Sequence, residues 1–329
     1  TGEWWFDHEK LAAAIQPIAD AATRAPTNLR WLGGQVVAGE GSQPGLRGDA
    51  WASIPAVIDA LTYGHEFAEL TVHEDTAFDP ATLGINIQHV LGSASTYYGD
   101  SSANRKTNVE VAARALNGAM IPPGGTFSFN DAIGGTATLE DGYMMGYGIV
   151  AEGGEVLTVP SVAGGICQVS TTTFQAAFWA GMPIVERSWH LYWIPRYGNG
   201  VGGLQGLDAT VDPDYGLDFK FHNPTDQWLA ISAWADGQYI GVEVWGVHQG
   251  WTVEVEGPEI TNVIEASDEI IRRTDESLNP GQEVWVENAE DGFTAAIHRV
   301  VKDSDGNVLD DHVFTSFYQP ASNVVLVGP

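Results

Sequence analysis

The C-terminal part of the chain alternates apolar and polar residues with a period of two over several successive segments. The pattern is clear in "WTVEV" at 251–255, "EVWVEN" at 283–288 and "HVFTSFY" at 312–318. A period of two gives a β-strand one apolar face, whereas an amphipathic helix needs a period of about 3.6. Turn residues separate these segments, namely Asn279-Pro280-Gly281, Asp291-Gly292 and Asp305-Gly306. Residues 251–329 are therefore predicted to form a small antiparallel β module.

Residues 1–92 have a mainly helical pattern. One helix is predicted within "DHEKLAAAIQPIADAAT" and is expected to break at Pro17, because proline lacks the N–H that an interior helical position uses. Another is predicted within "WASIPAVIDALTYG", with Pro55 in its first turn and Gly64 as its C-cap. The stretch between them, "LRWLGGQVVAGEGSQPGL", has the pattern of a strand-turn segment.

Residues 93–250 combine predicted helices and strands with many glycine and aromatic residues. One helix is predicted in "SANRKTNVEVAARALNGAMI", with Thr107 or Asn108 as N-cap and Asn117-Gly118 as its end. Two strands joined by a glycine turn are predicted in "DGYMMGYGIVAEGGEVLTVP", and a buried helix in "VSTTTFQAAFWAGM". Alternating strands follow in "LDFKFHNPTDQWLAISAWADGQYIGVEVWG". The predicted fold is α+β and elongated, with modules at 1–92, 93–250 and 251–329.

The chain has a formal net charge of −29, from 43 acidic and 14 basic residues. This charge repels phosphate backbones and anionic lipid headgroups, so nucleic acid and bare phospholipid are poor partners. No apolar run reaches the ~20 residues that a membrane-spanning helix needs, and no membrane span is expected. The sequence opens at Thr1 without a signal-peptide pattern, as in a processed, secreted chain. Such a start hints at export and thus at an extracellular location.

The single cysteine, Cys167, lies between the pair Gly164-Gly165 and a predicted helix. A thiol at a helix N-terminus is near the positive end of the helix dipole, which favours the thiolate. His190 follows in "ERSWHLYW" near Glu186, and Asp208 lies further on in "GLDATV". A cysteine, a histidine and a carboxylate are the parts of a nucleophile activated by an oriented base. A second interpretation stays open, in which Cys167 is an inert residue of the core.

The region around Cys167 and the C-terminal tail can be compared with the patterns of anion, dinucleotide and metal sites. Backbone N–H groups in the turn around Gly165 could bind an anion such as a carboxylate. The segment "AGGICQ" lacks the lysine of a phosphate loop, so a dinucleotide site is not expected. In the stretch "DSDGNVLDDH" and beyond it, Val308 and Phe314 stand where a calcium loop needs Gly and Glu. The histidines lack zinc spacing, and neither a metal nor a cofactor is predicted.

Several segments of the middle zone occur in a long and specific order. They are "SASTYYGDSSANRKTNVEVAARALNG", "IPPGGTFSFNDAIG", "GGICQVSTTTFQAAFWAGMPIVERSWH", "GLDATV" and "GLDFKFHNPTDQWLAISA". This pattern, over residues 93 to about 247, closely resembles the VanW family. Residues 8–92 are similar to the peptidoglycan-binding region often found before that domain, and the tail resembles the G-five β module. The resemblance implies an exported bacterial cell-envelope protein whose partner is peptidoglycan or another cell-wall glycan.

The family's pattern falls on many single positions, and the polar residues among them would be unusual in a core. The positions are Arg105, Asn108, Pro123, Gly124, Phe127, Ser128, Asn130, Gly164, Gly165, Cys167, Gln168, Ser170, Thr171, Thr172, Glu186, Arg187, His190, Asp208, Asp218 and Asn223. No reaction is attached to the family. On an enzymatic hypothesis Cys167 attacks an amide carbonyl and His190 transfers the proton. The candidate substrate-binding residues are Gly164, Gly165, Gln168, Ser170, Thr171, Thr172, Arg105, Asn130 and Arg187.

Two further parts complete this hypothetical site. Glu186 or Asp208 is expected to orient His190, and backbone N–H groups after Cys167 are expected to bind the oxyanion. The chain departs from the family in two places. Ala163 replaces a usual third glycine, which predicts a less open turn before Cys167. The loop "RYGNGVGGLQG" is longer than usual, which predicts either a displaced Asp208 or a covered site.

Two functions from different classes remain open at this point. The first is recognition or remodelling of a cell-envelope polymer, most plausibly peptidoglycan, by cysteine-based amide chemistry. The second is a non-catalytic wall-binding or surface-structural protein, which could self-associate into a homopolymer through exposed β edges of the tail. Thiol reactivity distinguishes them, because a structural cysteine is inert in the folded protein and a site cysteine reacts at neutral pH.

Overall fold

The structure, a computed structural model, describes residues 6–24, 28–39, 43–75, 84–152 and 155–329. About 21% of the chain is helical and 39% is in strands, mostly antiparallel, which confirms the predicted α+β class. The chain divides into two compact units, residues 1–85 and residues 86–329. In the described residues no helix is both long and apolar enough to cross a membrane.

The described part of the first unit contains two helices and two antiparallel pairs of strands. Its elements are α1 His8–Ala22, β1 Leu29–Leu32, β2 Gln35–Ala38, β3 Gly45–Asp49, α2 Ile54–Tyr63 and β4 Thr71–Asp75. Strand β1 pairs with β2 across the turn at Gly33 and Gly34, which confirms the predicted strand-turn segment. Strand β3 pairs with β4, so this region is mixed in character. Its small core consists of Ala12, Ile15, Ala19, Ala50 and Ile54.

Each of the two helices of this unit contains a proline whose effect is predicted from the sequence. The expected break at Pro17 is wrong, because α1 continues through Pro17 to Ala22. Pro17 and Ala13 are both exposed, so water can satisfy the Ala13 carbonyl that loses its helical donor. The prediction for α2 is confirmed, since Pro55 lies in the first turn and Gly64 ends the helix with a φ of 73°. A left-handed residue at that position is the conformation that glycine adopts without strain.

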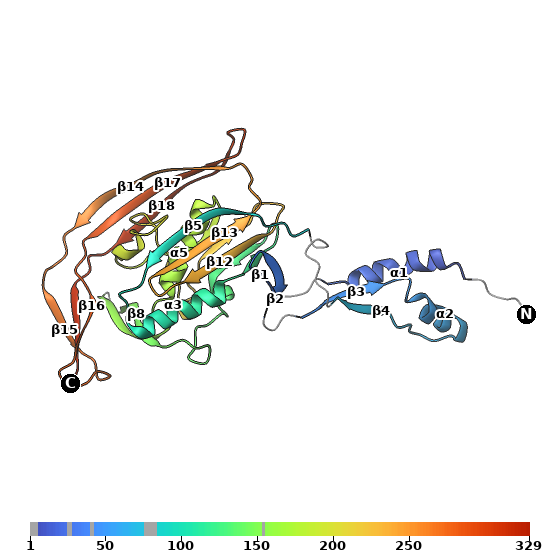
Figure 1. The fold of residues 1–329 in the computed structure, drawn as a ribbon, viewed down its shortest axis with the longest axis horizontal. Coiled ribbons are helices and arrows are strands. Elements are labelled where there is room, and N and C mark those ends of the chain that lie inside the picture. The colour runs from blue at the N-terminus through green and yellow to red at the C-terminus, as the bar shows by residue number, and fades with distance from the viewer. Residues whose placement is uncertain (1–5, 25–27, 40–42, 76–83, 153–154) are drawn as a thin grey trace, which may run out of the picture. The chain divides into compact units, whose positions relative to one another are not determined.

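The second unit is built on a four-stranded antiparallel sheet with the strand order β5-β13-β12-β6. Its strands are β5 His89–Tyr97, β6 Met120–Ile121, β12 Leu229–Ala235 and β13 Tyr239–Gly246. Helices α3 Ala103–Leu116 and α5 Ile166–Trp179 pack against this sheet (Figure 1). At Gly92 of β5 a Cβ atom would lie 2.3 Å from the Ala180 nitrogen, so the backbone of the sheet closely approaches the end of α5. Almost all of α5 is buried, as predicted.

Two helix boundaries differ from the predictions. Helix α3 begins after Ser102, whose side chain accepts a hydrogen bond from the Arg105 N–H, so Thr107 and Asn108 are interior residues and not the N-cap. Its end at Asn117-Gly118 is confirmed. Helix α5 begins at Ile166, before the predicted start at Val169, and this extension places Cys167 in the first helical turn.

Shorter elements complete the region around α5. They are β7 Thr126–Ser128, α4 Phe129–Ala132, β8 Met145–Glu152, β9 Glu155–Val162, β10 Ile184–Glu186, the 3-10 turns η2 Pro195–Tyr197 and η3 Pro213–Tyr215, and β11 Lys220–His222. Strands β8 and β9 form the predicted hairpin, whose glycine turn lies outside the described residues. Strands β10, β11 and β7 form a small antiparallel sheet. Phe127, Phe174, Phe178, Phe219 and Phe221 form the aromatic centre of the core.

The C-terminal residues form two three-stranded sheets, in the orders β14-β17-β18 and β15-β19-β16. Their strands are β14 Thr252–Ile264, β15 Ile270–Thr274, β16 Glu283–Glu287, β17 Gly292–Lys302, β18 Val308–Tyr318 and β19 Asn323–Val327. The predicted β character is confirmed, and the turn at Asp305-Gly306 joins β17 to β18. One pair, β15 with β19, is parallel.

Arg299 of β17 connects these strands to α5. Its side chain is fully buried and donates hydrogen bonds to the carbonyl oxygens of Phe178 and Met182, each at 3.0 Å. Its guanidinium also lies 5.1 Å from the ring centroid of Phe314 and pairs with Asp310 at 2.7 Å. A buried cation bonded in this way joins the two segments firmly. The module boundary predicted at residue 250 thus falls within one compact unit.

Candidate functional site

The turn before Cys167 is shaped by close backbone contacts. Ala163 has a φ of 62° and is 1% exposed, so an alanine occupies the left-handed position where the family usually has glycine. A Cβ atom at Gly164 would lie 2.5 Å from the Tyr147 carbonyl oxygen of β8. Gly165 has a φ of 121° and begins α5. The turn therefore keeps the glycine-like geometry despite Ala163.

Ala163→Gly is expected to change the free energy of unfolding by less than about 0.5 kcal/mol. Release of left-handed strain, ~1–2 kcal/mol, offsets the lost burial of a methyl group and the greater entropy of unfolded glycine. Ala177→Gly, at a fully buried position inside α5, is the matched control and should cost about 2 kcal/mol. Urea unfolding of the full chain measures both. Equal losses in the two variants would contradict the strain at Ala163.

Cys167 is partly buried in the first turn of α5 and faces the segment after Asp208. Its sulfur lies 3.5 Å from the Thr210 Oγ1 and 3.4 Å from the Val211 carbonyl oxygen. Burial by itself raises the pKa of the Cys167 thiol. Hydrogen bonding to His190, the charge of His190 and the contacts with Thr210 and Val211 outweigh burial, so the pKa lies below its ordinary value. The environment thus favours a thiolate.

His190 is buried and bonded to Asp208. The Asp208 Oδ2 accepts hydrogen bonds from the His190 Nδ1 at 2.5 Å and from the His190 backbone N–H at 3.0 Å. Burial lowers the pKa of His190, but Asp208 and Cys167 more than compensate and raise it to about 9. Because Asp208 engages Nδ1, Nε2 is the nitrogen left for exchange with the thiol. His190 and Cys167 together have the electrostatics of an imidazolium–thiolate pair.

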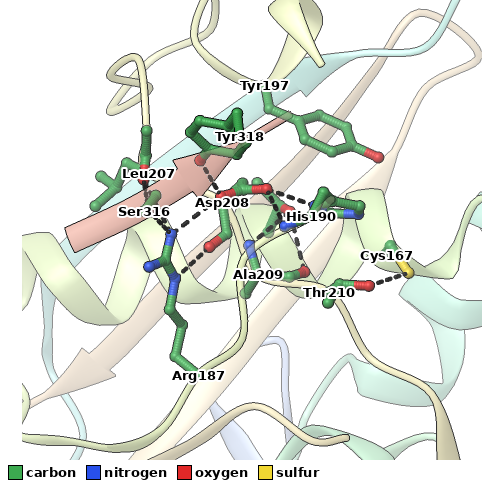
Figure 2. A network of polar contacts seen from close by, with 12 residues as sticks. Cys167, Arg187, His190, Tyr197, Leu207, Asp208, Ala209, Thr210, Ser316 and Tyr318 are labelled. Carbon is green, nitrogen blue, oxygen red and sulfur yellow. Dashed lines mark hydrogen bonds and ion pairs between the residues drawn. The ribbon is translucent and has the colours of Figure 1, made fainter. Parts of the chain in front are cut away.

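Asp208 is the centre of a buried polar network (Figure 2). Its Oδ1 accepts hydrogen bonds from the Arg187 Nη2 at 3.0 Å and from the Tyr318 hydroxyl at 2.6 Å. Burial raises the pKa of a carboxyl group, but His190, Arg187 and Tyr318 hold the pKa of Asp208 below its ordinary value. Asp208 is therefore an anion that fixes the orientation of His190.

Arg187 is held in turn by backbone and side-chain acceptors. Its Nε donates to the Asp208 carbonyl oxygen at 2.6 Å, and its Nη2 donates to the Gly206 carbonyl oxygen at 2.9 Å and to the Ser316 Oγ at 2.8 Å. The Arg187 side chain is only 6% exposed. Arg187 thus holds the Asp208 carboxylate in place. Its side chain is too buried to contact a substrate, in contrast to the predicted substrate contact.

The long loop after "YWIP" does not displace Asp208. Its first residues form the 3-10 turn η2, and the Tyr197 ring lies 5.3 Å from the His190 ring, centroid to centroid. Further along, the Val201 carbonyl oxygen accepts a hydrogen bond from the Ser95 N–H, and the Gly202 carbonyl oxygen accepts one from the Trp179 indole. Of the two predicted consequences of this insertion, the structure has the second, since Tyr197 covers one side of His190.

Glu186 is not the residue that orients His190. It lies on β10, where its Oε1 accepts a hydrogen bond from the Asp218 N–H and its Oε2 pairs with Lys220 at 2.8 Å. Asn130 belongs to the same neighbourhood, because its backbone N–H donates to Asp218 and its side chain donates to the Leu217 carbonyl oxygen. Sequence proximity of Glu186 to His190 is misleading here, because Glu186 lies on β10 and bonds Asp218 and Lys220, whereas His190 lies beyond the strand and bonds Asp208.

Four of the predicted substrate-binding residues on α5 are completely buried, namely Gln168, Ser170, Thr171 and Thr172. The Gln168 amide donates to Thr96 and to the Tyr97 carbonyl oxygen, each at 2.9 Å, which fixes α5 to β5. The Thr171 hydroxyl bonds both the N–H and the carbonyl oxygen of Ala209. These residues thus hold the segment that carries Asp208 in place, and a substrate cannot reach them in this structure.

Other polar positions of the pattern also serve buried backbone groups. The Asn108 side chain bonds the N–H and the carbonyl oxygen of Met144 and the Gly164 carbonyl oxygen. The Asn223 amide donates to three carbonyl oxygens and its oxygen accepts from Thr225. Because buried polar groups need partners, such side chains can belong in a core when the backbone around them is irregular.

Arg105 of α3 lies beside the start of α5. Its Cγ would be 3.1 Å from a Cβ atom at Gly165, and its Nη1 donates to the Ser101 hydroxyl at 2.8 Å. The charge of Arg105 also interacts with Cys167 and Tyr197. Of the predicted substrate-binding residues, Arg105, Gly164 and Gly165 are thus the ones that remain at the thiol.

Several residues of this site were not among the sequence candidates, namely Tyr197, Thr210, Ser316 and Tyr318. Thr210 directly follows the segment of Asp208, and the motif "GLDATV" contained it. Ser316 and Tyr318 come from β18, more than a hundred residues after Asp208. No local pattern marks them. Among the described residues there is no group of three His, Cys, Asp or Glu side chains that could hold a metal ion.

Comparisons with known proteins place these motifs in context. The sequence profile of the family described as VanW like protein matches residues 104–245. The uncharacterized protein YoaR of Bacillus subtilis is 38% identical over 177 residues, which are 53% of this chain and 54% of that protein. The vancomycin B-type resistance protein VanW of Enterococcus faecalis is 30% identical over 138 residues, 42% of this chain and 47% of that protein. The chain spans about half the length of these curated relatives.

One solved structure bears on the prediction for the tail. The crystal structure of HP0197-G5 aligns with 24% of this chain and 97% of its own, at 15% sequence identity and a TM-score of 0.12. A TM-score this low does not establish a shared fold. The G-five assignment of residues 251–329 and the peptidoglycan-binding assignment of residues 8–92 stay predictions.

Proposed function

We propose that this chain, whose residues 104–245 match the family described as VanW like protein, remodels a cell-envelope polymer by cysteine-based amide chemistry. The polymer that the proposal names is peptidoglycan, whose stem peptides contain amide bonds. One observation carries the proposal, namely that His190 is bonded to Asp208 and interacts electrostatically with the Cys167 thiol. The three residues include the elements of a nucleophile, a proton carrier and an orienting anion.

The proposed reaction is acyl transfer. The Cys167 sulfur attacks the amide carbonyl carbon, and the electron pair of the C=O bond moves to the oxygen. When the intermediate collapses, the C–N bond breaks and the leaving nitrogen takes the proton from the His190 Nε2. Water or an amine then attacks the thioester and releases Cys167. Asp208 keeps Nδ1 engaged throughout, so that Nε2 points to the reacting atoms.

Loss of turnover in a Cys167→Ser variant is the expected result that tests this function. Purified full-length protein is incubated with peptidoglycan fragments, and amide cleavage or exchange is followed by mass spectrometry. The variant should lose at least about a hundredfold in rate, because a serine hydroxyl has no thiolate-like ionisation in this environment. Asp311→Asn, on the exposed side of β18, is the matched control and should retain the wild-type rate. Full activity of the cysteine variant would contradict the proposal.

A second candidate function has its own support in the C-terminal strands. Trp285 and Phe317 are 55% and 54% exposed, and exposed aromatic rings suit stacking on sugars. Strands β14 and β18 are the edges of their sheet, where another chain could add a strand. On this proposal the protein binds the wall or assembles on the surface without catalysis. Sedimentation with purified peptidoglycan, unchanged in Cys167→Ser but weakened in Trp285→Ala, would support it.

A further inference from the structure

Tyr197 is a buried phenol beside the thiol–imidazole pair. The residue is 2% exposed, its ring packs against His190, and its carbonyl oxygen accepts a hydrogen bond from the Gln175 amide. Its hydroxyl has no hydrogen-bond partner among the described residues. Figure 2 shows this hydroxyl at the same end of the network as the Cys167 thiol, with the His190 ring between them. A phenol hydroxyl in this position can donate a hydrogen bond to a group bound beside the thiol.

The charges around Tyr197 define what its hydroxyl can bind. Burial raises the pKa of Tyr197, and so the phenol keeps its proton and acts as a hydrogen-bond donor at neutral pH. Arg105 and Cys167 both interact electrostatically with Tyr197. Arg105 has further N–H donors beyond the one that bonds Ser101. Two donors, one of them cationic, therefore lie close enough to Cys167 to interact with it electrostatically, in a chain of net charge −29.

The backbone is a weaker candidate for the same purpose. The Gln168 N–H, which directly follows Cys167, already donates to the Gly165 carbonyl oxygen at 3.0 Å. A hydrogen bond used inside the first helical turn is not free for a substrate oxygen. The expected binding of an oxyanion by N–H groups after Cys167 is therefore not supported at this position.

We propose that the Tyr197 hydroxyl and the Arg105 guanidinium together stabilise the negatively charged oxygen that forms when the Cys167 sulfur attacks a carbonyl carbon. This assignment rests on the proposed amide chemistry. The new C–S bond takes its electrons from the sulfur, and the displaced C=O pair becomes the oxyanion that both donors bind. Donors placed in advance at such an oxygen stabilise the transition state more than the substrate. Tyr197 ends the 3-10 turn η2, which fixes its backbone beside His190.

Two reagents separate oxyanion stabilisation from thiol ionisation. Iodoacetamide alkylates the thiolate by direct displacement, without an oxyanion, whereas 4-nitrophenyl acetate acylates it through a tetrahedral oxyanion and releases nitrophenol. In Tyr197→Phe, which keeps the ring on His190, acylation should slow by at least about tenfold, as expected for the loss of one oxyanion donor. Alkylation should stay within about twofold, because the thiolate is preserved.

The controls use the full chain. Tyr143→Phe removes a buried, unpartnered phenol hydroxyl elsewhere in the core, one whose neighbouring charges are Asp141 and Arg114, and both rates should stay at the wild-type value. Arg105→Lys keeps the charge but loses the planar fork, so acylation should slow while the pH midpoint of alkylation stays unchanged.

The possible outcomes distinguish the oxyanion assignment from the proposed amide chemistry on which it rests. Slower acylation with unchanged alkylation in Tyr197→Phe supports the assignment. Unchanged acylation in a protein that is readily acylated overturns the assignment and leaves the proposed function standing. Parallel losses in both reactions also overturn it, because Tyr197 would then only position His190. A wild-type thiol that is alkylated but never acylated overturns the proposed function and this assignment together.

Discussion

Replacing Asp208 with asparagine is expected to lower the free energy of unfolding of the second unit by about 3–5 kcal/mol, the usual cost of breaking a buried ion pair from one side. Asp208 is fully buried and accepts hydrogen bonds from His190, Arg187 and Tyr318. An asparagine has no charge and has two N–H donors, which would face other donors in this network. The Arg187 guanidinium would also stay buried without its counter-charge.

Urea unfolding of the full chain, followed by both circular dichroism and tryptophan fluorescence, measures this loss. Asp311→Asn is the matched control, because Asp311 pairs with His298 at an exposed position and should cost at most about 1 kcal/mol. If Asp208→Asn does not fold, Tyr318→Phe gives a graded measure, since it removes one hydrogen bond to Asp208 and should cost roughly 1–3 kcal/mol. Equal stabilities of Asp208→Asn and Asp311→Asn would show that the network does not stabilise the fold.

The Asp208 carboxylate also makes the stability of the protein depend on pH. The pKa of Asp208 is lowered in the folded state, so its contribution is fully present above the unfolded value of about 3.9. That contribution is lost as the pH falls through the folded pKa. The pKa of His190 is raised to about 9, so its contribution is present below about 6.5 and is lost as the pH rises through about 9. The stability that this pair contributes should therefore be greatest between about pH 3.9 and about pH 6.5.

The second large effect is expected in His190→Ala, where the pH midpoint of Cys167 alkylation should rise above about 8.5, the ordinary thiol value. In the wild type, His190 outweighs burial and lowers the pKa of Cys167. Without the imidazole the thiol loses both a hydrogen bond and a neighbouring positive charge, while burial still opposes ionisation. The midpoint is the right quantity to measure, since a thiolate of higher pKa is also more nucleophilic and partly conceals the change in rate at one pH.

The matched variant for this measurement is His298→Ala. His298 lies on β17, pairs with Asp311 and is partly exposed, so its removal should leave the Cys167 midpoint unchanged. A wild-type thiol that reacts only after denaturation would identify Cys167 as an inert core residue. A low midpoint that persists in His190→Ala would instead assign the effect to the helix dipole of α5 and to Arg105.

The sequence predicts the elements best where one local pattern dominates. Period-two alternation identifies β16 to β19, and the Pro55 and Gly64 signals locate α2. Prediction from sequence fails where the extent of an element depends on contacts with other residues or with solvent. Pro17 is tolerated because the face of α1 that it weakens is exposed. Ser102 caps α3 although Thr107 and Asn108 are equally good capping residues on propensity alone.

The candidate site likewise contains residues that the sequence predicts and residues whose role depends on contacts in the folded chain. The family resemblance predicts Cys167, His190 and Asp208, and their contacts make physical sense of that pattern. The resemblance could not predict which polar residues contact solvent, and for that reason Gln168 and Thr172 look like ligand contacts when they are buried supports. Tyr318 is 110 residues from Asp208, so only the folded chain brings the two together.

The contacts of Arg299, Ser316 and Tyr318 with the VanW-like region bear on how such chains evolve. A recombination event near residue 250 that exchanged the C-terminal strands for an unrelated module would leave Asp208 and Arg187 without two of their partners. It would also open the end of α5 that Arg299 closes. In this chain residues 251–329 are therefore structurally coupled to the segment that carries Asp208, although the sequence pattern predicts a separate module there.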